Sequence, residues 1–225
     1  MSEIRRPVLA VNFKAYGQVE GPGAVDLAIA CQDVSAETGV CIAACPPTVE
    51  LSAVARAVRI PVLSQGLDPL DAGPRTGWVT PSAVRACGCA GTLLNHSERV
   101  LGMNAIADAV AMCRRSGLAT VVCADSEVTA AAAAEMRPDF IAVEPPALIG
   151  GDVSVTTASP EAVSETVRRV RAVNEGIGVL CGAGVKNSKD VSKALGLGAD
   201  GVLLASGVVK AADWRAVLRE LASGF

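Results

Sequence analysis

The sequence repeats one pattern from end to end: a short apolar run, then a polar or glycine-containing turn, then a segment with helical periodicity. Eight apolar runs follow this pattern, and they are Val8–Phe13, Cys41–Cys45, Pro61–Gln65, Gly91–Asn95, Thr120–Ala124, Phe140–Glu144, Gly178–Gly182 and Gly201–Ser206. Strands that alternate with helices pair in parallel, because each helix carries the chain back to the start of the next strand. The repeat therefore predicts an α/β fold with a parallel sheet.

The segments between the runs have the spacing of helices that cover a sheet. Two stripes of apolar residues show it, namely Leu51, Val54, Ala55 and Val58, and Val163, Val167, Val170 and Val173. Such spacing places each set on one helix face. Cap residues agree: Thr80 and Ser159 each precede a proline, Asn187 or Ser188 can cap the next helix, and Gly117 and Gly196 or Gly198 suit helix ends.

Eight β/α units can form an open doubly wound sheet or a closed barrel. No GxGxxG motif follows the first run, where a dinucleotide-binding open sheet usually carries one. Eight units match the closure of a barrel, and no linker or shift of composition divides the chain. We therefore expect residues 1–225 to form a single (β/α)8 barrel domain with an outer ring of helices.

Composition limits the classes of partner and location. The formal net charge is −3 and no run of one sign is long, which argues against nucleic acid and anionic membranes as partners. The apolar runs are too short to span a bilayer, and the N-terminus has no usable signal sequence. We therefore expect a cytoplasmic protein. The eight cysteines form no CxxC pair and there is one histidine, so we expect structural thiols and no metal site.

Polar side chains follow several of the predicted strands. In a (β/α)8 barrel, the residues that carry the chemistry lie at the carboxyl ends of the strands. Lys14, just after the first run, can neutralise an anionic substrate and the charge that develops on its oxygen. His96 precedes Ser97-Glu98, which has the character of a first helical turn, and a helix N-terminus would keep its imidazole neutral. Glu144 leaves a fully apolar run, so desolvation would raise its pKa towards that of a useful base.

Small residues follow the last two runs. Gly182-Ala183-Gly184 and Ala205-Ser206-Gly207 lie where this fold often binds phosphate through backbone N–H groups. The segment 147–151 after Glu144 has an apolar tip and two glycines, as a lid over a substrate would need. A base, a neutral acid, a cation and a phosphate site suit abstraction of a proton next to a carbonyl, through an enediolate. We expect no cofactor.

Five segments resemble the triosephosphate isomerase family, in the order in which that family carries them. They are Asn12-Phe13-Lys14, Thr76-Gly77, His96-Ser97-Glu98-Arg99, Glu144-Pro145-Pro146 with Ile149-Gly150, and Gly182-Ala183-Gly184. The resemblance implies interconversion of dihydroxyacetone phosphate and glyceraldehyde 3-phosphate. It implies that Glu144 is the base and His96 the electrophile, as in that family.

The same resemblance implies the other roles. Lys14 would bind the substrate and stabilise charge with Asn12 beside it, and Glu98 would lie near Lys14. The substrate would also contact Ile149, Gly150, Gly151, Gly184, Ala205 and Ser206, mainly through phosphate-binding amides. Thr76 resembles the residue that reaches into the site of a partner subunit, which implies a homo-oligomer.

Four departures mark this chain within the family. It is short, Asn95 stands where most members have glycine, Pro146 stands where many have tryptophan, and Cys181-Gly182-Ala183 replaces Tyr-Gly-Gly. All four resemble the compact archaeal branch, which favours a tetramer over a dimer. Two other interpretations stay open: another phosphate-binding barrel, such as a sugar-phosphate epimerase or a lyase, and a thiol or metal protein.

Overall fold

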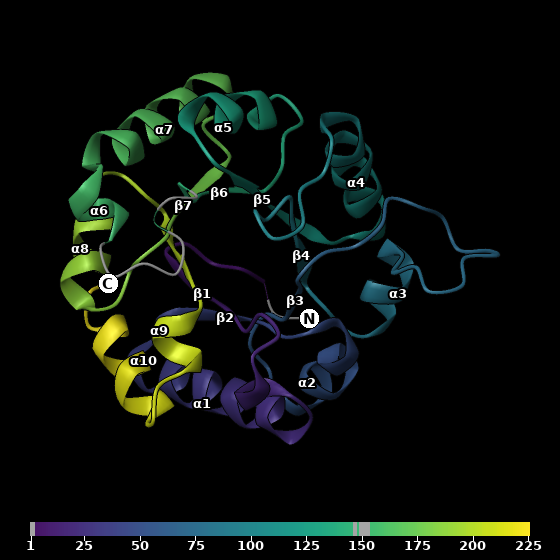
Figure 1. The fold of residues 1–225 in the computed structure, drawn as a ribbon, viewed down its shortest axis with the longest axis horizontal. Helices are drawn as coiled ribbons and strands as arrows, with labels where there is room; N and C mark the ends of the chain where they lie inside the picture. The colour runs from purple at the N-terminus through teal and green to yellow at the C-terminus, as the bar shows by residue number, and fades with distance from the viewer. Residues whose placement is uncertain (1–2, 146–147, 149–153) are drawn as a thin grey trace.

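The computed structural model describes residues 3–145, 148 and 154–225. Eight strands surround the centre of the molecule and the helices form a ring outside them (Figure 1). The strands are β1 (Val8–Asn12), β2 (Cys41–Cys45), β3 (Leu63–Ser64), β4 (Gly91–Leu94), β5 (Ala119–Ala124), β6 (Phe140–Val143), β7 (Gly178–Gly182) and β8 (Gly201–Leu204). Each overlaps one of the eight predicted runs, so the predicted strands are confirmed.

All strand pairs are parallel, in the order β2-β1-β8-β7-β6-β5-β4-β3. A further parallel bridge joins Ala44 in β2 to Val62, just before β3, and so links the two ends of this row. The sheet therefore closes on itself, and the prediction of a (β/α)8 barrel over an open sheet is confirmed.

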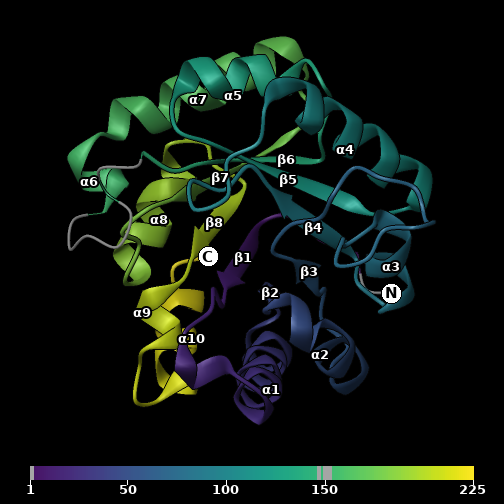
Figure 2. The ribbon, with the colours of Figure 1, turned by 45° about the vertical axis from the view of Figure 1, so that its right-hand side comes forward.

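Helices cover the outside of the strands. They are α1 (Pro22–Thr38), α2 (Leu51–Ala57), α3 (Pro81–Ala86), α4 (Met103–Ser116), α5 (Glu127–Ala134), α6 (Val155–Ala158), α7 (Pro160–Val173), α8 (Ser188–Gly196), α9 (Ser206–Val209) and α10 (Trp214–Ala222). Two short 3-10 turns, η1 (Gly17–Val19) and η2 (Thr48–Glu50), precede α1 and α2. The loop between β3 and α3 projects from the ring at the right of Figure 1, and this side is turned towards the viewer in Figure 2. None of the helices in the described ranges is long and apolar enough to cross a bilayer.

The core has two layers because side chains alternate along each strand. In β1, Val8 and Ala10 point into the barrel, whereas Leu9 and Val11 pack outwards against the helices. The inner layer is rich in Ala and Cys, and it contains Cys41, Cys45 and Cys123. Small side chains suit the narrow interior, and the buried thiols act there as packing groups.

Most of the predicted helix ends are confirmed. The Thr80 hydroxyl accepts a hydrogen bond from Ala83 N, and the Asn187 side chain accepts one from Asp190 N. Gly117 ends α4 in the left-handed conformation, and Gly198 (φ 95°) follows the end of α8.

The predicted start of α7 is confirmed, but its last apolar residue does not lie as expected. Ser159 is the N-cap residue and Pro160 the first helical residue, although the Ser159 side chain makes no capping hydrogen bond. Ser159 also ends α6, where its N–H is bonded to Val155 O, and its backbone (φ −150°, ψ 61°) is not that of a usual N-cap. Val173 was expected to face the sheet, yet it is 36% exposed at the last residue of α7.

Candidate active site

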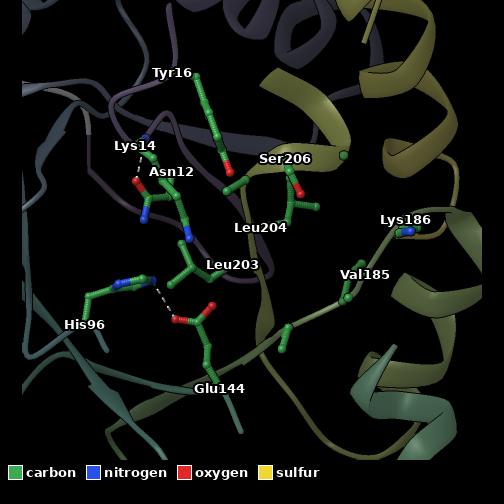
Figure 3. A pocket seen from close by; sticks show the side chains of 14 residues that line it. Asn12, Lys14, Tyr16, His96, Glu144, Val185, Lys186, Leu203, Leu204 and Ser206 are labelled. Carbon is green, nitrogen blue, oxygen red and sulfur yellow. Dashed lines mark hydrogen bonds and ion pairs between the residues drawn. The ribbon is translucent and has the colours of Figure 1, made fainter. Parts of the chain in front are cut away.

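One cavity lies at the carboxyl ends of the strands (Figure 3). It collects side chains from three distant parts of the chain: Asn12 at the end of β1 with Lys14 just after it, His96 after β4, and Glu144 after β6. The loops after β7 and β8 complete it with Gly184, Val185, Ala205, Ser206 and Gly207. The structure therefore brings the predicted base, electrophile, cation and phosphate-binding turns to one place.

Lys14 is held in a constrained backbone conformation. Its φ is 51°, a region that L-residues other than Asn and Asp rarely adopt and that costs on the order of 1–3 kcal/mol. Two neighbours stabilise it: Lys14 N donates to Asn12 Oδ1 at 3.0 Å, and Gln65 Nε2 donates to Lys14 O at 2.9 Å. The Lys14 ammonium then lies 2.7 Å from Glu98 Oε1. The turn thus aims the cation across the mouth of the barrel towards Glu98.

His96 is the only histidine and its side chain is almost fully buried. Its Nδ1 accepts a hydrogen bond from Glu98 N at 3.2 Å, which assigns the proton of the neutral ring to Nε2. Burial lowers the pKa of His96, the Lys14 ammonium lowers it further, and the Glu98 carboxylate opposes both. The ring is therefore uncharged near neutral pH, with an N–H donor at Nε2.

The expected cause of that neutral ring is wrong. Ser97 and Glu98 lie in a turn, and α4 begins only at Met103, so the segment after His96 does not place a helix N-terminus at the imidazole. Desolvation is the main cause instead. The predicted direction of the pKa shift is right, because burial and a nearby cation both disfavour the charged imidazolium, as a helix N-terminus would.

The Glu144 side chain points at His96, and its Oε2 lies 3.5 Å from His96 Nε2 (Figure 3). This Oε2 has no hydrogen-bond partner among the residues described. Burial raises the pKa of Glu144 to about 7, Lys14 and the Cys123 thiol pull it down, and Glu98 raises it. A carboxylate with a buried oxygen that accepts no hydrogen bond and with a pKa near 7 is well suited to accept a proton.

Gly182 in β7 leaves the space that the Glu144 side chain occupies. A methyl group at Gly182 would lie 2.5 Å from Glu144 Cγ and 2.9 Å from Oε1. The glycine is needed for its lack of a side chain here, because its φ is not in the left-handed region.

The far end of the cavity is built from backbone. Ala183 and Gly184 both have φ of 73°, so the turn after β7 bends sharply. The first hydrogen bonds of α9 run from Val208 N and Val209 N to Ala205 O. The N–H groups of Ser206 and Gly207 precede that bonded turn, and such groups at a helix start are suited to an anion.

Some of the predicted residues lie outside the cavity wall. Glu98 pairs with Lys14 at the rim, next to Lys14 as the resemblance implied. Thr76 is exposed on the loop between β3 and α3 and does not line this cavity. Ile149, Gly150 and Gly151 lie outside the described residues.

Other neighbours were not predicted. Tyr16 and Leu203 line the cavity, and Gln65 and Cys123 support Lys14 and Glu144 from outside its wall. Gln65 ends the third apolar run, and Cys123 alternates with Val121, which also faces the barrel interior. The end of an apolar run could have identified Gln65, and the alternation along the strand could have identified Cys123.

The thiols do not form a site. All eight cysteines are free, and all but the half-buried Cys87 are buried. Within the described ranges, no group of three or more His, Cys, Asp or Glu side chains could hold a metal ion.

A barrel whose polar cavity opens at the carboxyl ends of its strands, with acid–base groups at one end and an anion-binding turn at the other, defines a (β/α)8 enzyme of phosphorylated substrates. The protein-family model of triosephosphate isomerase matches residues 7–221. The chain therefore belongs to the triosephosphate isomerase family, and it is an isomerase.

Curated relatives cover almost the whole chain. Triosephosphate isomerase of Methanopyrus kandleri is 47% identical over 223 residues, which is 98% of this chain and 99% of that protein. The enzymes of Methanosarcina acetivorans and Methanocaldococcus jannaschii are 45% and 42% identical, over 96% and 95% of this chain and 97% and 98% of theirs. This agrees with the resemblance to the archaeal branch.

Proposed function

We propose that this chain interconverts dihydroxyacetone phosphate and D-glyceraldehyde 3-phosphate, with Glu144 as the base. The observation that carries the assignment is the buried, unpaired Oε2 of Glu144, which faces a neutral imidazole N–H at 3.5 Å. With its pKa raised to about 7, Glu144 is partly ionised at neutral pH and can both take a proton and return it.

The proton moves between neighbouring carbons of the triose. Glu144 removes a proton from the carbon next to the carbonyl and the electron pair moves onto the carbonyl oxygen, which gives an enediolate. The Nε2–H of His96 and the Lys14 ammonium stabilise that oxygen, with Asn12 beside them. Glu144 then returns the proton to the other carbon, and the oxygens exchange their remaining proton through His96. No atom is gained or lost, so no cofactor is required.

The phosphate group occupies the backbone end of the cavity. The amides near Gly184 and Ser206, with Ala205 at the start of α9, would bind its oxygens. We include Ile149, Gly150 and Gly151 as a lid because of the family resemblance. The lid would exclude water, which strengthens each electrostatic contact inside.

We propose a homo-oligomer, a tetramer with a dimer as the alternative. A second cavity beside the site is lined by Lys14, Gln65, Glu98 and Arg99, and it suits the tip of a partner's projecting loop with Thr76. Trp78 on that loop is 57% exposed, as an interface residue would be in an isolated chain.

A second apolar surface favours the tetramer. Val100 and Met103, 72% and 44% exposed, lie beside a cavity that Thr129 of α5 also lines. Sedimentation equilibrium of the purified protein would measure the mass directly. A monomer that retains full activity would contradict this part of the proposal.

We further propose that residues 1–225 act as one barrel domain in the cytoplasm. The family match over residues 7–221 supports one functional unit. Eight free thiols support a reducing compartment, because such compartments keep cysteines unpaired.

A coupled assay with purified protein tests the reaction. Dehydrogenase-linked turnover of glyceraldehyde 3-phosphate should be measured for the parent chain and for Glu144→Gln, with Glu165→Gln on the outer helix α7, away from the cavity, as the matched control. We expect the control to match the parent and Glu144→Gln to lose at least about 10³-fold in kcat. A parent without turnover would favour another phosphate-binding barrel, and a fully active Glu144→Gln would remove Glu144 as the base.

A further inference from the structure

One side chain closes the turn that carries His96 and Glu98. Asn95 immediately follows β4, and its Oδ1 accepts a hydrogen bond from Leu101 N at 2.9 Å. Its Nδ2 donates to Cys123 O, near the carboxyl end of β5, at 3.0 Å. Asn95 therefore ties the far end of the turn to its start, and ties the start to the neighbouring strand.

The backbone conformation at Asn95 is also one that few residue types adopt. Its φ is 59°, in the left-handed region where glycine is the usual choice and asparagine is among the best-tolerated alternatives. A glycine would adopt this conformation but could make neither of the two side-chain hydrogen bonds. Asparagine here supplies both the conformation and the bonds.

The packing around the turn increases the importance of those bonds. Behind the turn lies a cavity lined by Asn95, Ser97, Leu101, Cys123 and Glu144. A segment over a cavity lacks the close-packed side chains that hold most buried groups in place. Its geometry depends more on the hydrogen bonds at its ends.

The two bonds connect the proposed electrophile to the proposed base. Within the turn, Glu98 N donates to His96 Nδ1, and this contact places the imidazole proton on Nε2. On the other side, the thiol of Cys123, the residue whose carbonyl accepts from Asn95, interacts with the Glu144 carboxyl and lowers its pKa. Asn95 thus joins the turn of His96 to the strand residue that contacts Glu144.

We propose that Asn95 is a positioning residue of the isomerase: through Leu101 N and Cys123 O it fixes the His96 turn, and so sets the separation and the tautomer of His96 relative to Glu144. This inference rests on the proposed roles of Glu144 and His96. It adds a residue that touches neither the substrate nor the reacting atoms.

Two variants separate the contributions of the side chain. Asn95→Gly keeps access to a positive φ and loses both hydrogen bonds. Asn95→Asp keeps the acceptor for Leu101 N and loses the donor to Cys123 O. Asn174→Gly is the matched control, because Asn174 Oδ1 accepts a hydrogen bond from Gly176 N before β7, at the opposite face of the barrel.

The readouts are kcat and KM, the thermal midpoint, and the ¹⁵N spectrum of the imidazole. His96 is the only histidine, so its two ring nitrogens are observed without overlap and report the tautomer. We expect Asn95→Gly to lower kcat about 10- to 100-fold with a much smaller change in KM, because a misplacement of about 1 Å costs rate more than binding. Asn95→Asp should fall between Asn95→Gly and the parent, and Asn174→Gly should match the parent in kcat.

The spectrum distinguishes positioning from stability. In the parent, Nε2 should carry the proton; in Asn95→Gly, the two nitrogens should shift towards each other as the tautomers mix. A kcat within about twofold of the parent, with an unchanged spectrum in both Asn95 variants, would overturn the proposal. If the parent had no isomerase activity, the proposed function would fail, and the spectrum alone would still decide whether Asn95 holds the His96 tautomer.

Discussion

The close contact between Gly182 and Glu144 predicts that Gly182→Ala lowers kcat and leaves the fold intact. In Gly182→Ala, the new methyl carbon would lie 2.5 Å from Glu144 Cγ, 2.9 Å from Oε1 and 3.0 Å from Cδ. Two carbon atoms are at their best separation at about 3.5–4.0 Å, so the methyl and Cγ must separate by about 1 Å or more. The three nearest atoms all belong to the Glu144 side chain, so we expect the strain to be relieved by moving that carboxylate.

The expected size of the effect follows from that displacement. A reacting group misplaced by about 1 Å costs on the order of 10²-fold in rate, so kcat should fall by about that factor. Stability should change little, because the φ of Gly182 suits an L-residue and alanine restricts the unfolded chain more than glycine does. The thermal midpoint should therefore stay within a few degrees of that of the parent.

The assay is the coupled kinetic measurement together with thermal unfolding. Gly196→Ala is the matched control, since a methyl group there meets nothing within 4 Å and α8 accommodates alanine well. The control should keep the kcat of the parent. A Gly182→Ala protein with kcat within about threefold of the parent would refute the reasoning, because the carboxylate would then not need the space over β7.

Four further predictions concern charge and thiols. Burial raises the pKa of Glu144 from 4.5 to about 7, so ionisation of Glu144 opposes folding as the pH rises through that range. Glu144→Gln should therefore gain thermal stability relative to the parent at pH 8 and gain less at pH 5; an equal gain at both values would contradict the shift. The parent's kcat/KM should rise with pH through about 7 as the base ionises, and a flat profile from pH 5 to 8 would argue against it. Lys14→Met should fold normally yet lose at least about 10²-fold in kcat/KM, because a cation at the substrate oxygens is removed; an unchanged kcat/KM would place Lys14 outside the site. A thiol reagent should label the half-buried Cys87 first, since burial raises the pKa of thiols such as Cys31 to about 12; rapid labelling of all eight cysteines in the native protein would contradict the fold.

The barrel could be predicted from local patterns because those patterns reflect strong, short-range preferences. Runs such as Phe140–Val143 are apolar on both faces, which suits only a strand covered on both sides. Thr80 and Asn187 cap their helices as expected because a cap is a contact within a few residues. Ser159 occupies the predicted N-cap position of α7, but it also ends α6, and its side chain makes no capping hydrogen bond.

The site was predictable only as a set of positions. Residues at the carboxyl ends of parallel strands must meet, so Lys14, His96 and Glu144 could be assigned to one rim before their contacts were known. Supporting residues were missed because their roles depend on neighbours far along the chain. Gln65 reaches the carbonyl of Lys14, 51 positions away, and Cys123 contacts Glu144 across adjacent strands.

The sequence by itself therefore determined the order of strands and helices, the closure of the barrel and the residues at its mouth, because these follow from periodicity and chain direction. Only the tertiary structure decided how those residues behave. The raised pKa of Glu144, the neutral ring of His96 and the space above Gly182 arise from burial and from contacts between distant segments. Such effects depend on which atoms surround a group and how far water is excluded, and neither quantity is defined until the chain is folded.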